Sequence, residues 1–443
     1  MSEWGRRGGV LVDVAVIAAV VAAGTVVAGV LHDPGDEATA ATGTGVSVVR
    51  PPVEYPTEIP GCDRVEPPYS GERIAFAGVG SGATYDDPNY PWFSGPKASA
   101  MSAALVGALP AAVDVVFASP QQSFVFEPMW TFGGPEQPEG PPVDLFGGRT
   151  TASGTVTRGP AVGSLTADVH RSDEPVPPCV AGELTRRTTL ADGSVVDSQD
   201  TWVEYDGVRR LVRSADAYLP DGTRIRLSLD DRKSGELPLT VDELAAIALT
   251  PGLRASAPVP AGTPPPPASC HAGEGDGASA SLNRGTVDRL NRTLDDHWQR
   301  ETTKPGSLDR PLGSLQLAES DSGSVCEVLT VTTPVGESDL RVSITGGRVP
   351  HLPEPSPDGG FSGARRSAER LADGTVVERA EHSYALAGRD GADLGDETSR
   401  SVTVTRPSGT QVRVTSSAAV PGIPLAADWL ESVATAPGLE LSG

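Results

Sequence analysis

Residue types that commonly carry catalysis are sparse in this sequence, and their spacing matches no catalytic motif. The chain has 6 histidines in 443 residues, and none occurs in the H-E-x-x-H spacing that brings two imidazoles to one side of a helix around zinc. No G-x-S-x-G string occurs, so the sharp turn that presents the serine of many hydrolases is not encoded. We therefore expect no catalytic, cofactor-binding or metal-binding residue, and a protein that is not an enzyme.

Acidic groups are the exception, because they are numerous. Asp295-Asp296-His297 places two carboxyls beside an imidazole on a segment of helical pattern, which could serve as an acid/base or metal patch. A solvated helix face explains the same residues, since charged side chains are usually exposed. A carboxylate pair for glycoside hydrolysis also fits a chain with 58 acidic residues, although no pair can be located. A cell-wall hydrolase or peptidase thus remains an alternative function.

Four aromatic residues form a candidate partner-binding site. Tyr85, Tyr90, Trp92 and Phe93 cluster in a segment rich in proline and glycine. If they are exposed on a loop, they provide a surface for a protein or glycan partner. The competing interpretation is an ordinary hydrophobic core, because large aromatic side chains are usually buried.

The charge balance excludes nucleic acid as a partner. Asp and Glu number 58 against 35 Lys and Arg, for a formal net charge of -23. Residues 1–31 are neutral overall, so the whole excess lies in residues 32–443. Such a surface repels phosphate backbones. It also disfavours lying flat on anionic lipid.

The N-terminal segment predicts a membrane anchor. Val10–Leu31 spans 22 positions with one charged residue, which is long enough to cross a bilayer as a helix. Arg6 and Arg7 precede it, so the positive-inside bias makes residues 1–9 a cytoplasmic tail and places the bulk outside the cell membrane. The alternative is a signal peptide cleaved after Ala38-Thr39-Ala40, an A-x-A site. Both interpretations export the folded part.

The exported part is duplicated. Two C-terminal blocks share nine identical positions at an offset of 186 residues, and two upstream pairs of blocks follow in the same order at offsets of 181 and 187. Three ordered matches indicate an internal repeat of two related domains. The paired blocks are Leu190–Val196 with Leu371–Val377, Pro220–Leu227 with Pro407–Val414, and Leu237–Ser256 with Ile423–Ser442.

The repeated blocks also predict the secondary structure and an α+β fold class. Asp-Gly and Ser-Gly pairs at 192–193, 221–222, 373–374 and 408–409 are typical of hairpin turns between strands. Thr240 and Glu243 form a capping box at the start of a short closing helix, and Thr286–Arg300 has apolar residues at helical spacing. Each domain is therefore expected to be an antiparallel sheet with one or two helices packed on it, plus one N-terminal transmembrane helix.

Four cysteines should form two disulfide bonds in an oxidising exterior. Three pairings are formally open. The duplication favours one bond in each domain, which pairs Cys62 with Cys179 and Cys270 with Cys326. A weaker match between Gly163-Ser-Leu165 and Gly313-Ser-Leu315, each upstream of the second cysteine of its half, points the same way.

Proline-rich composition sets the domain limits. We expect residues 32–60 to form a disordered stalk and residues 257–269 to form a semi-rigid linker. These segments divide the exported part into domain 1, residues 61–256, and domain 2, residues 270–443.

The chain as a whole resembles uncharacterised exported, membrane-anchored proteins of actinobacteria. The features that carry the resemblance are the basic tail, the single anchor and the repeated L-A-D-G-(S/T)-V-V and P-G-L blocks. The resemblance implies location alone. We expect a membrane-tethered extracytoplasmic binding or interaction protein, with a structural envelope spacer as a further alternative.

Overall fold

The computed structural model describes residues 48–49, 56–68, 82–131, 148–205, 207–232, 235–272, 282–319, 323–352, 365–387 and 393–441. The expected cytoplasmic tail and the expected anchor, residues 1–9 and 10–31, lie outside these ranges, as does most of the expected stalk. Among the described residues, no helix is long and apolar enough to cross a membrane.

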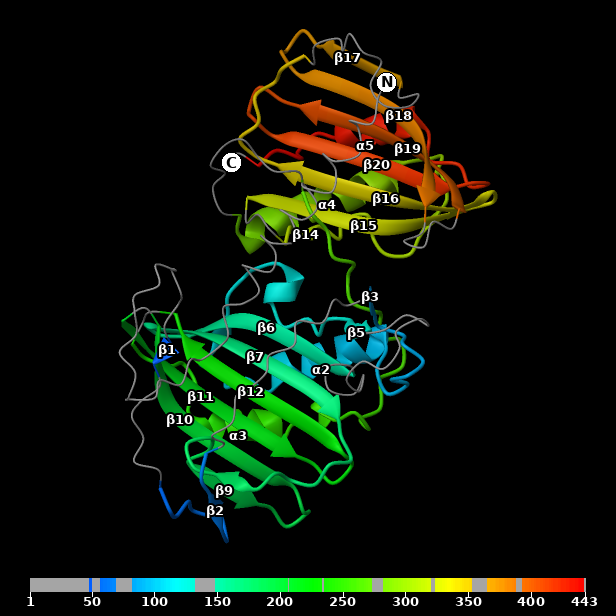
Figure 1. Ribbon diagram of the computed structural model, residues 1–443. Helices are drawn as coiled ribbons and strands as arrows, with labels where there is room; N and C mark the ends of the chain where they lie inside the picture. Colours follow the sequence, from blue (N-terminus) through cyan, green and yellow to red (C-terminus); the bar gives the residue numbers. More distant parts are fainter. Residues whose placement is uncertain are drawn as a thin grey trace, which may run out of the picture. The chain divides into compact units, whose positions relative to one another are not determined.

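The described chain falls into two compact units, each built around one large sheet (Figure 1). The described residues of unit 1 lie within 48–116 and 124–265, and those of unit 2 lie within 117–123 and 266–441. Both sheets are antiparallel throughout, and two α-helices accompany each of them in the described residues. The coarse expectation of an α+β chain with two sheet-rich domains is thus confirmed.

The sheet of unit 1 has eight strands in the described part of the chain, in the order β1-β10-β11-β12-β7-β6-β4, with β9 also paired to β10. Helix α2 (Gly95–Gly107) comes before the long strands, and helix α3 (Val241–Ala248) comes after them. The strands are β1 (Val48–Val49), β4 (Asp114–Val115), β6 (Arg149–Arg158), β7 (Ala161–Arg171), β9 (Arg186–Thr189), β10 (Val195–Tyr205), β11 (Val208–Tyr218) and β12 (Thr223–Asp231).

The sheet of unit 2 likewise has eight described strands, in the order β13-β15-β16-β20-β19-β18-β17, with β14 paired to β15. Helix α4 (Arg284–Arg300) precedes the long strands and helix α5 (Ala427–Ala434) follows them. The strands are β13 (Ser307–Leu308), β14 (Gln316–Leu317), β15 (Ser324–Thr333), β16 (Gly336–Thr345), β17 (Arg365–Arg370), β18 (Val376–Ala387), β19 (Asp393–Thr405) and β20 (Gln411–Ala419).

Six strands and two helices have the same arrangement in both units. The order β9-β10-β11-β12-β7-β6 in unit 1 corresponds to β17-β18-β19-β20-β16-β15 in unit 2. Helix α2 corresponds to α4 by its place in the chain, and α3 to α5. The repeated sequence blocks therefore mark a repeated topology.

The matched blocks coincide with tight turns between these strands. Glycines 193, 222, 374 and 409 all have φ between 81° and 88°, a left-handed conformation that favours glycine. In each turn, a side-chain oxygen accepts a hydrogen bond from the backbone N–H two residues later. The acceptors are Asp192, Asp221, Asp373 and Ser408, and the donors are Ser194, Thr223, Thr375 and Thr410. These side-chain turns explain why the blocks are conserved between the two halves.

Side-chain alternation gives each sheet one apolar and one polar face. In β7, Leu165, Ala167 and Val169 are fully buried, and they belong to the same core as residues of α2 and α3. The residues between them are half-buried and point to the opposite side of the sheet. We call that opposite side the outer face of each unit.

The closing helices begin differently in the two units. Thr240 accepts a hydrogen bond from the backbone N–H of Glu243, and the Glu243 carboxylate accepts one from the backbone N–H of Thr240. The predicted capping box is therefore confirmed. At the equivalent place in unit 2, Ala426 provides no side-chain cap, so α5 depends more on packing of its apolar side.

A buried lysine holds the end of unit 1 against α2. Lys97 is 3% exposed, and its Nζ donates to the carbonyl oxygens of Arg254 and Ala257 at 2.7 and 2.6 Å. Burial lowers the pKa of Lys97 to about 8, while Asp221 opposes that shift. The two bonds fix the chain just beyond the 3-10 helix Pro251–Leu253.

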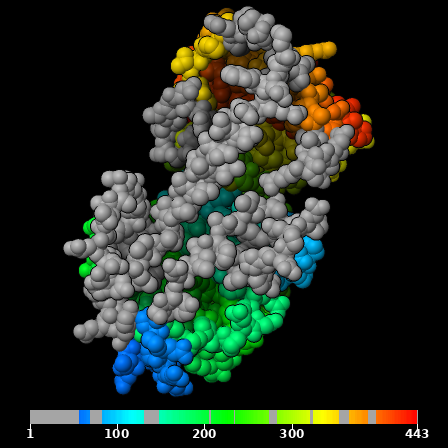
Figure 2. Space-filling view, in the orientation of Figure 1, coloured from blue at the N-terminus to red at the C-terminus, as the bar shows by residue number. Residues whose placement is uncertain are grey.

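The disulfide bonds join Cys62 to Cys179 and Cys270 to Cys326, which is the predicted pairing. Cys179 begins β8 (Cys179–Val180), which pairs in parallel with β2 (Val65–Glu66). In the space-filling view the N-terminal described segment of unit 1, in blue, lies on the surface beside the green residues near position 190 (Figure 2).

The two bonds do not occupy equivalent places in the repeat. Cys326 lies within β15, whereas the corresponding strand of unit 1 contains no cysteine. The weaker sequence match was also wrong as a sign of the repeat. Gly163-Ser164-Leu165 lies in β7, whereas Gly313-Ser314-Leu315 precedes β14, and these places are not equivalent. The tripeptide similarity is therefore unrelated to the repeated topology.

Removing one disulfide bond should destabilise its own unit alone. We expect Cys62→Ser with Cys179→Ser to lower the free energy of unfolding of unit 1 by about 2–5 kcal/mol, because the bond closes a long loop in the unfolded chain. Calorimetry should show one transition moved to lower temperature and the other unchanged. Cys270→Ser with Cys326→Ser should move the other transition, and a shift of both transitions by either pair contradicts this assignment.

Candidate functional site

The four aromatic residues singled out from the sequence are packed into the core of unit 1. Phe93 is 3% exposed, and Tyr85, Tyr90 and Trp92 are partly buried against the same core. The Tyr85 hydroxyl donates to the Phe126 carbonyl oxygen at 3.1 Å, and burial, with a contribution from Glu127, raises the pKa of Tyr85 to about 12. In the structure, these rings contribute to the core instead of forming an exposed patch.

The acidic motif on the predicted helix also has structural contacts. An Asp295 carboxylate oxygen accepts a hydrogen bond from the backbone N–H of Gly313 at 2.8 Å. Nε2 of His297 lies 3.4 Å from the Ser432 hydroxyl and 3.8 Å from a Glu301 carboxylate oxygen. Among the described residues, no group of three or more histidine, cysteine or acidic side chains is placed to hold a metal ion.

A larger group of ionisable residues lies on the outer face of unit 1, which sequence patterns did not reveal. It consists of two rows that run across the strands, each row made of residues in direct register. Read from β9 to β6, the acidic row is Arg187, Asp197, Asp216, Arg226, Asp168 and Thr151, and the basic row is Thr189, Val195, Tyr218, Arg224, His170 and Arg149.

One end of the acidic row is closed by a nearly buried ion pair. The Arg187 guanidinium donates to both Asp197 carboxylate oxygens at 2.6 Å, and its Nη2 also donates to the Pro177 carbonyl oxygen. The two side chains are 13% and 10% exposed. Hydrogen bonding to Asp197 raises the pKa of Arg187. This bidentate pair is satisfied internally.

The remaining carboxylates of the acidic row are less well paired. Asp216 has Arg226 as its ion-pair partner, with an Nε–Oδ1 distance of 3.6 Å. Burial raises the pKa of Asp216, Arg226 opposes this, and the neighbouring Asp197 and Asp168 carboxylates add to the increase. Asp168 accepts a hydrogen bond from the Thr151 hydroxyl at 2.7 Å. The middle of the row thus has two acidic groups and one arginine.

The basic row has His170 between two arginines on adjacent strands. Burial, together with Arg149 and Arg224, lowers the pKa of His170 to about 4, and Asp168 opposes this shift. Nδ1 of His170 is buried and has no hydrogen-bond partner in the described part of the chain. Its imidazole is therefore neutral at physiological pH.

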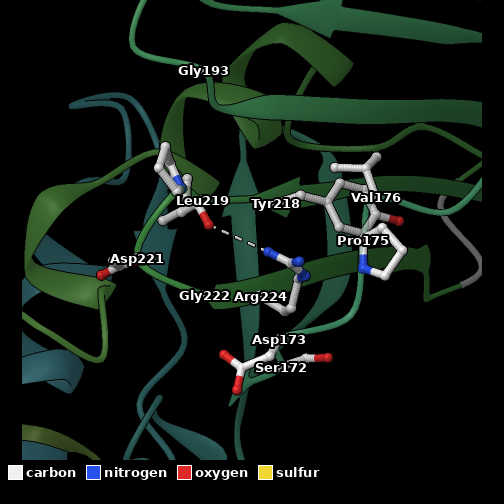
Figure 3. A pocket seen from close by; sticks show the side chains of 11 residues that line it. Ser172, Asp173, Pro175, Val176, Gly193, Tyr218, Leu219, Asp221, Gly222 and Arg224 are labelled. Carbon is white, nitrogen blue, oxygen red and sulfur yellow. Dashed lines mark hydrogen bonds between the residues drawn. The ribbon is translucent and has the colours of Figure 1, made fainter.

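Arg224 joins the basic row to a surface pocket. The pocket has a volume of about 450 Å³ and opens beside the β11–β12 turn (Figure 3). Arg224 lies against the Tyr218 ring, with its guanidinium carbon 5.3 Å from the ring centroid, and donates to the Leu219 carbonyl oxygen. Other lining residues are Ser172, Asp173, Pro175, Val176 and Asp221. Burial raises the pKa of Tyr218, so this phenol stays neutral.

A second pocket reaches the other end of the acidic row. Its volume is about 370 Å³, and its lining includes Arg187, Val176 and the Cys62–Cys179 disulfide bond. Val176 lines both pockets. The segment between β7 and β8 therefore borders the cluster where it meets solvent.

The equivalent outer face of unit 2 lacks this cluster. When the matched turns and strand registers are followed, two of the five charged positions in the acidic row remain charged, and His170, Tyr218 and Arg224 have uncharged counterparts. The counterparts are Ala368, Glu378, Thr403, Arg413, Ser343 and Cys326 for the acidic row, and Arg370, Val376, Thr405, Gln411, Thr345 and Ser324 for the basic row.

Comparisons with known proteins add little to this description. No family model matches the chain, and no curated protein matches it. A solved structure of the di-domain ARO/CYC StfQ from the steffimycin biosynthetic pathway is similar at 11% sequence identity, with 73% of this chain and 81% of that chain covered and a TM-score of 0.13. A TM-score this low supports no conclusion about this chain.

The low pKa of His170 should appear in the pH dependence of stability. The folded-state pKa of about 4 lies below the ordinary histidine pKa of 6.5, so the unfolded chain binds this proton first as pH falls. We expect the histidine to lower the free energy of unfolding progressively from pH 6.5 to 4. Denaturant unfolding of the wild type and His170→Gln at pH 7 and 4.5 should show a smaller acid-induced loss in the variant.

The site assignment can also be checked directly. Carbon-13 labelled histidine should give one imidazole resonance that disappears in His170→Gln and titrates near pH 4. A His170 resonance that titrates near pH 6.5 contradicts the burial between two arginines.

Proposed function

We propose that the protein is a membrane-tethered extracytoplasmic binding protein, and that the outer face of unit 1 contacts its ligand. The observation that carries the proposal is the ionisable cluster on this face. Unit 2 has the same strand order and lacks most of the cluster, so the shared topology does not require these residues.

The energetics of the cluster support a binding role. Partly burying Asp216 and His170 removes solvent from polar groups that gain few hydrogen bonds in return, and such burial costs stability. Unit 2 avoids this cost with Thr403 and Thr345 at the corresponding positions. Residues that cost stability and are not needed for the fold are good candidates for ligand recognition.

The two disulfide bonds support the proposed compartment. Both pairs of cysteines are bonded, and the described structure has no free thiol. Disulfide bonds persist in oxidising, extracytoplasmic compartments. Together with the apolar segment Val10–Leu31 after Arg6 and Arg7, they favour export with the bulk of the chain outside the membrane.

Site-specific crosslinking in the native membrane tests the binding role. A photoreactive phenylalanine at Ser228, on the outer face next to the acidic row, should give a discrete covalent adduct. The same residue at Thr415, the equivalent position of unit 2, is the matched control and should give none. Asp216→Asn combined with Arg224→Gln should reduce the Ser228 adduct several-fold.

Two outcomes contradict the proposal. An envelope spacer predicts no adduct from either position. A sheet face that contacts its surroundings without selectivity predicts equal adducts from Ser228 and Thr415, unaffected by the changes at Asp216 and Arg224.

A further inference from the structure

Two rows of opposite charge lie side by side on the outer face of unit 1. The basic row has Arg224 and Arg149, and the acidic row has three aspartates and two arginines. Formal charges are therefore +2 and −1 with His170 neutral. Successive residues on one face of a strand are about 6–7 Å apart, so the centres of opposite charge are separated by about that distance.

The basic row is arranged to receive an anionic group. Arg149 and Arg224 are in register with His170 on the strands either side of it, which places their backbones about 9–10 Å apart. Arg224 already donates to the Leu219, Thr223 and Glu174 carbonyl oxygens. Because a guanidinium has five N–H groups, both arginines keep donors from which an oxyanion between them can accept hydrogen bonds. Because Arg224 lines the pocket, this end of the row can be reached from solvent.

The acidic row is arranged to receive a cation. Arg187 compensates Asp197 through two hydrogen bonds. Asp168 and Asp216 then share Arg226, whose side chain is 58% exposed and whose Nε lies 3.6 Å from Asp216. One negative charge is left over, on a surface that an ammonium group can approach past Arg226.

We propose that this cluster binds a zwitterionic ligand, whose carboxylate lies between Arg149 and Arg224 and whose ammonium group lies over Asp168 and Asp216. The inference rests on the proposed binding function and specifies the ligand class. A carboxylate fits better than a phosphate monoester, because the second negative charge of the monoester faces the aspartates. Short peptides and amino acids with the amine at the far end of the chain carry the two charges at about this spacing.

Small probes test each half of the site in the full-length protein. We would titrate 6-aminohexanoate, hexanoate and hexylamine at matched ionic strength while following the imidazole resonance of His170. Its surroundings are Arg149 on β6, Arg224 on β12 and Asp168 on its own strand. A carboxylate between the two arginines offsets their charge, so saturating 6-aminohexanoate should raise the pKa of His170.

The expected ranking identifies the zwitterion. Hexanoate should bind about fivefold more weakly than 6-aminohexanoate, because it lacks the ammonium group and so forms one partly exposed ion pair fewer. Hexylamine should not raise the His170 pKa, because its ammonium group can only offset Asp168, which favours the protonated imidazole. Equal binding of 6-aminohexanoate and hexanoate contradicts the proposed contact between the ammonium group and the acidic row. An unchanged His170 pKa with every probe overturns the proposal altogether.

Variants separate loss of binding from loss of folding. Asp216→Asn should abolish the preference for 6-aminohexanoate while hexanoate still binds, and the retained hexanoate binding shows that the variant is folded. Arg224→Gln should weaken both acids. Gln411→Ala, at the position of unit 2 that corresponds to Arg224, should change neither. An Asp216→Asn variant that keeps the fivefold preference contradicts the inference.

The outcome for the ligand class is independent of the outcome for the binding function. A specific adduct from Ser228 with no effect of 6-aminohexanoate means that the face binds a different ligand. If Ser228 gives no specific adduct and 6-aminohexanoate has no effect, the proposed binding role is contradicted as well.

Discussion

The packing of two helices against one face of an antiparallel sheet determines most of what this protein can do. Each unit buries alternate strand residues with its helices, so Leu165, Ala167 and Val169 belong to the core. The intervening residues, such as Asp168 and His170, are released from that requirement. The outer face can therefore differ between the two copies without loss of topology, and in unit 1 it carries ionisable groups that unit 2 lacks.

Local signals predicted the elements that depend on short-range interactions. The turns at Gly193, Gly222, Gly374 and Gly409 follow from left-handed glycines and side-chain acceptors two residues away. The start of α3 follows from the reciprocal bonds of Thr240 and Glu243. In each case the residues that determine the structure are close in sequence, so the element can be predicted before the fold is known.

The outer-face cluster could not be found in the same way, because it depends on pairing between distant strands. Asp168, Asp197, Asp216 and Arg226 belong to four strands and meet only through register. The alternation of Arg224, Arg226 and Ser228 with buried residues marks a strand with two different faces, but it does not identify the neighbouring strands. The four aromatic residues were singled out as a candidate surface, but they pack into the core around Phe93. Composition alone does not distinguish an exposed loop from a core.

The disulfide pairing was predicted correctly, although one supporting match was coincidental. Symmetry between the halves suggested one bond per unit, yet the bonds join non-equivalent places, with Cys326 inside a strand whose counterpart in unit 1 has no cysteine. Had both bonds descended from a common single-unit ancestor, they would occupy matching positions. Descent from one ancestral bond therefore does not explain the two crosslinks, because each unit has its own bond at its own place. The same arrangement of sheet and helices therefore accommodates disulfide bonds at different places in the two units, and it requires neither bond at a fixed place.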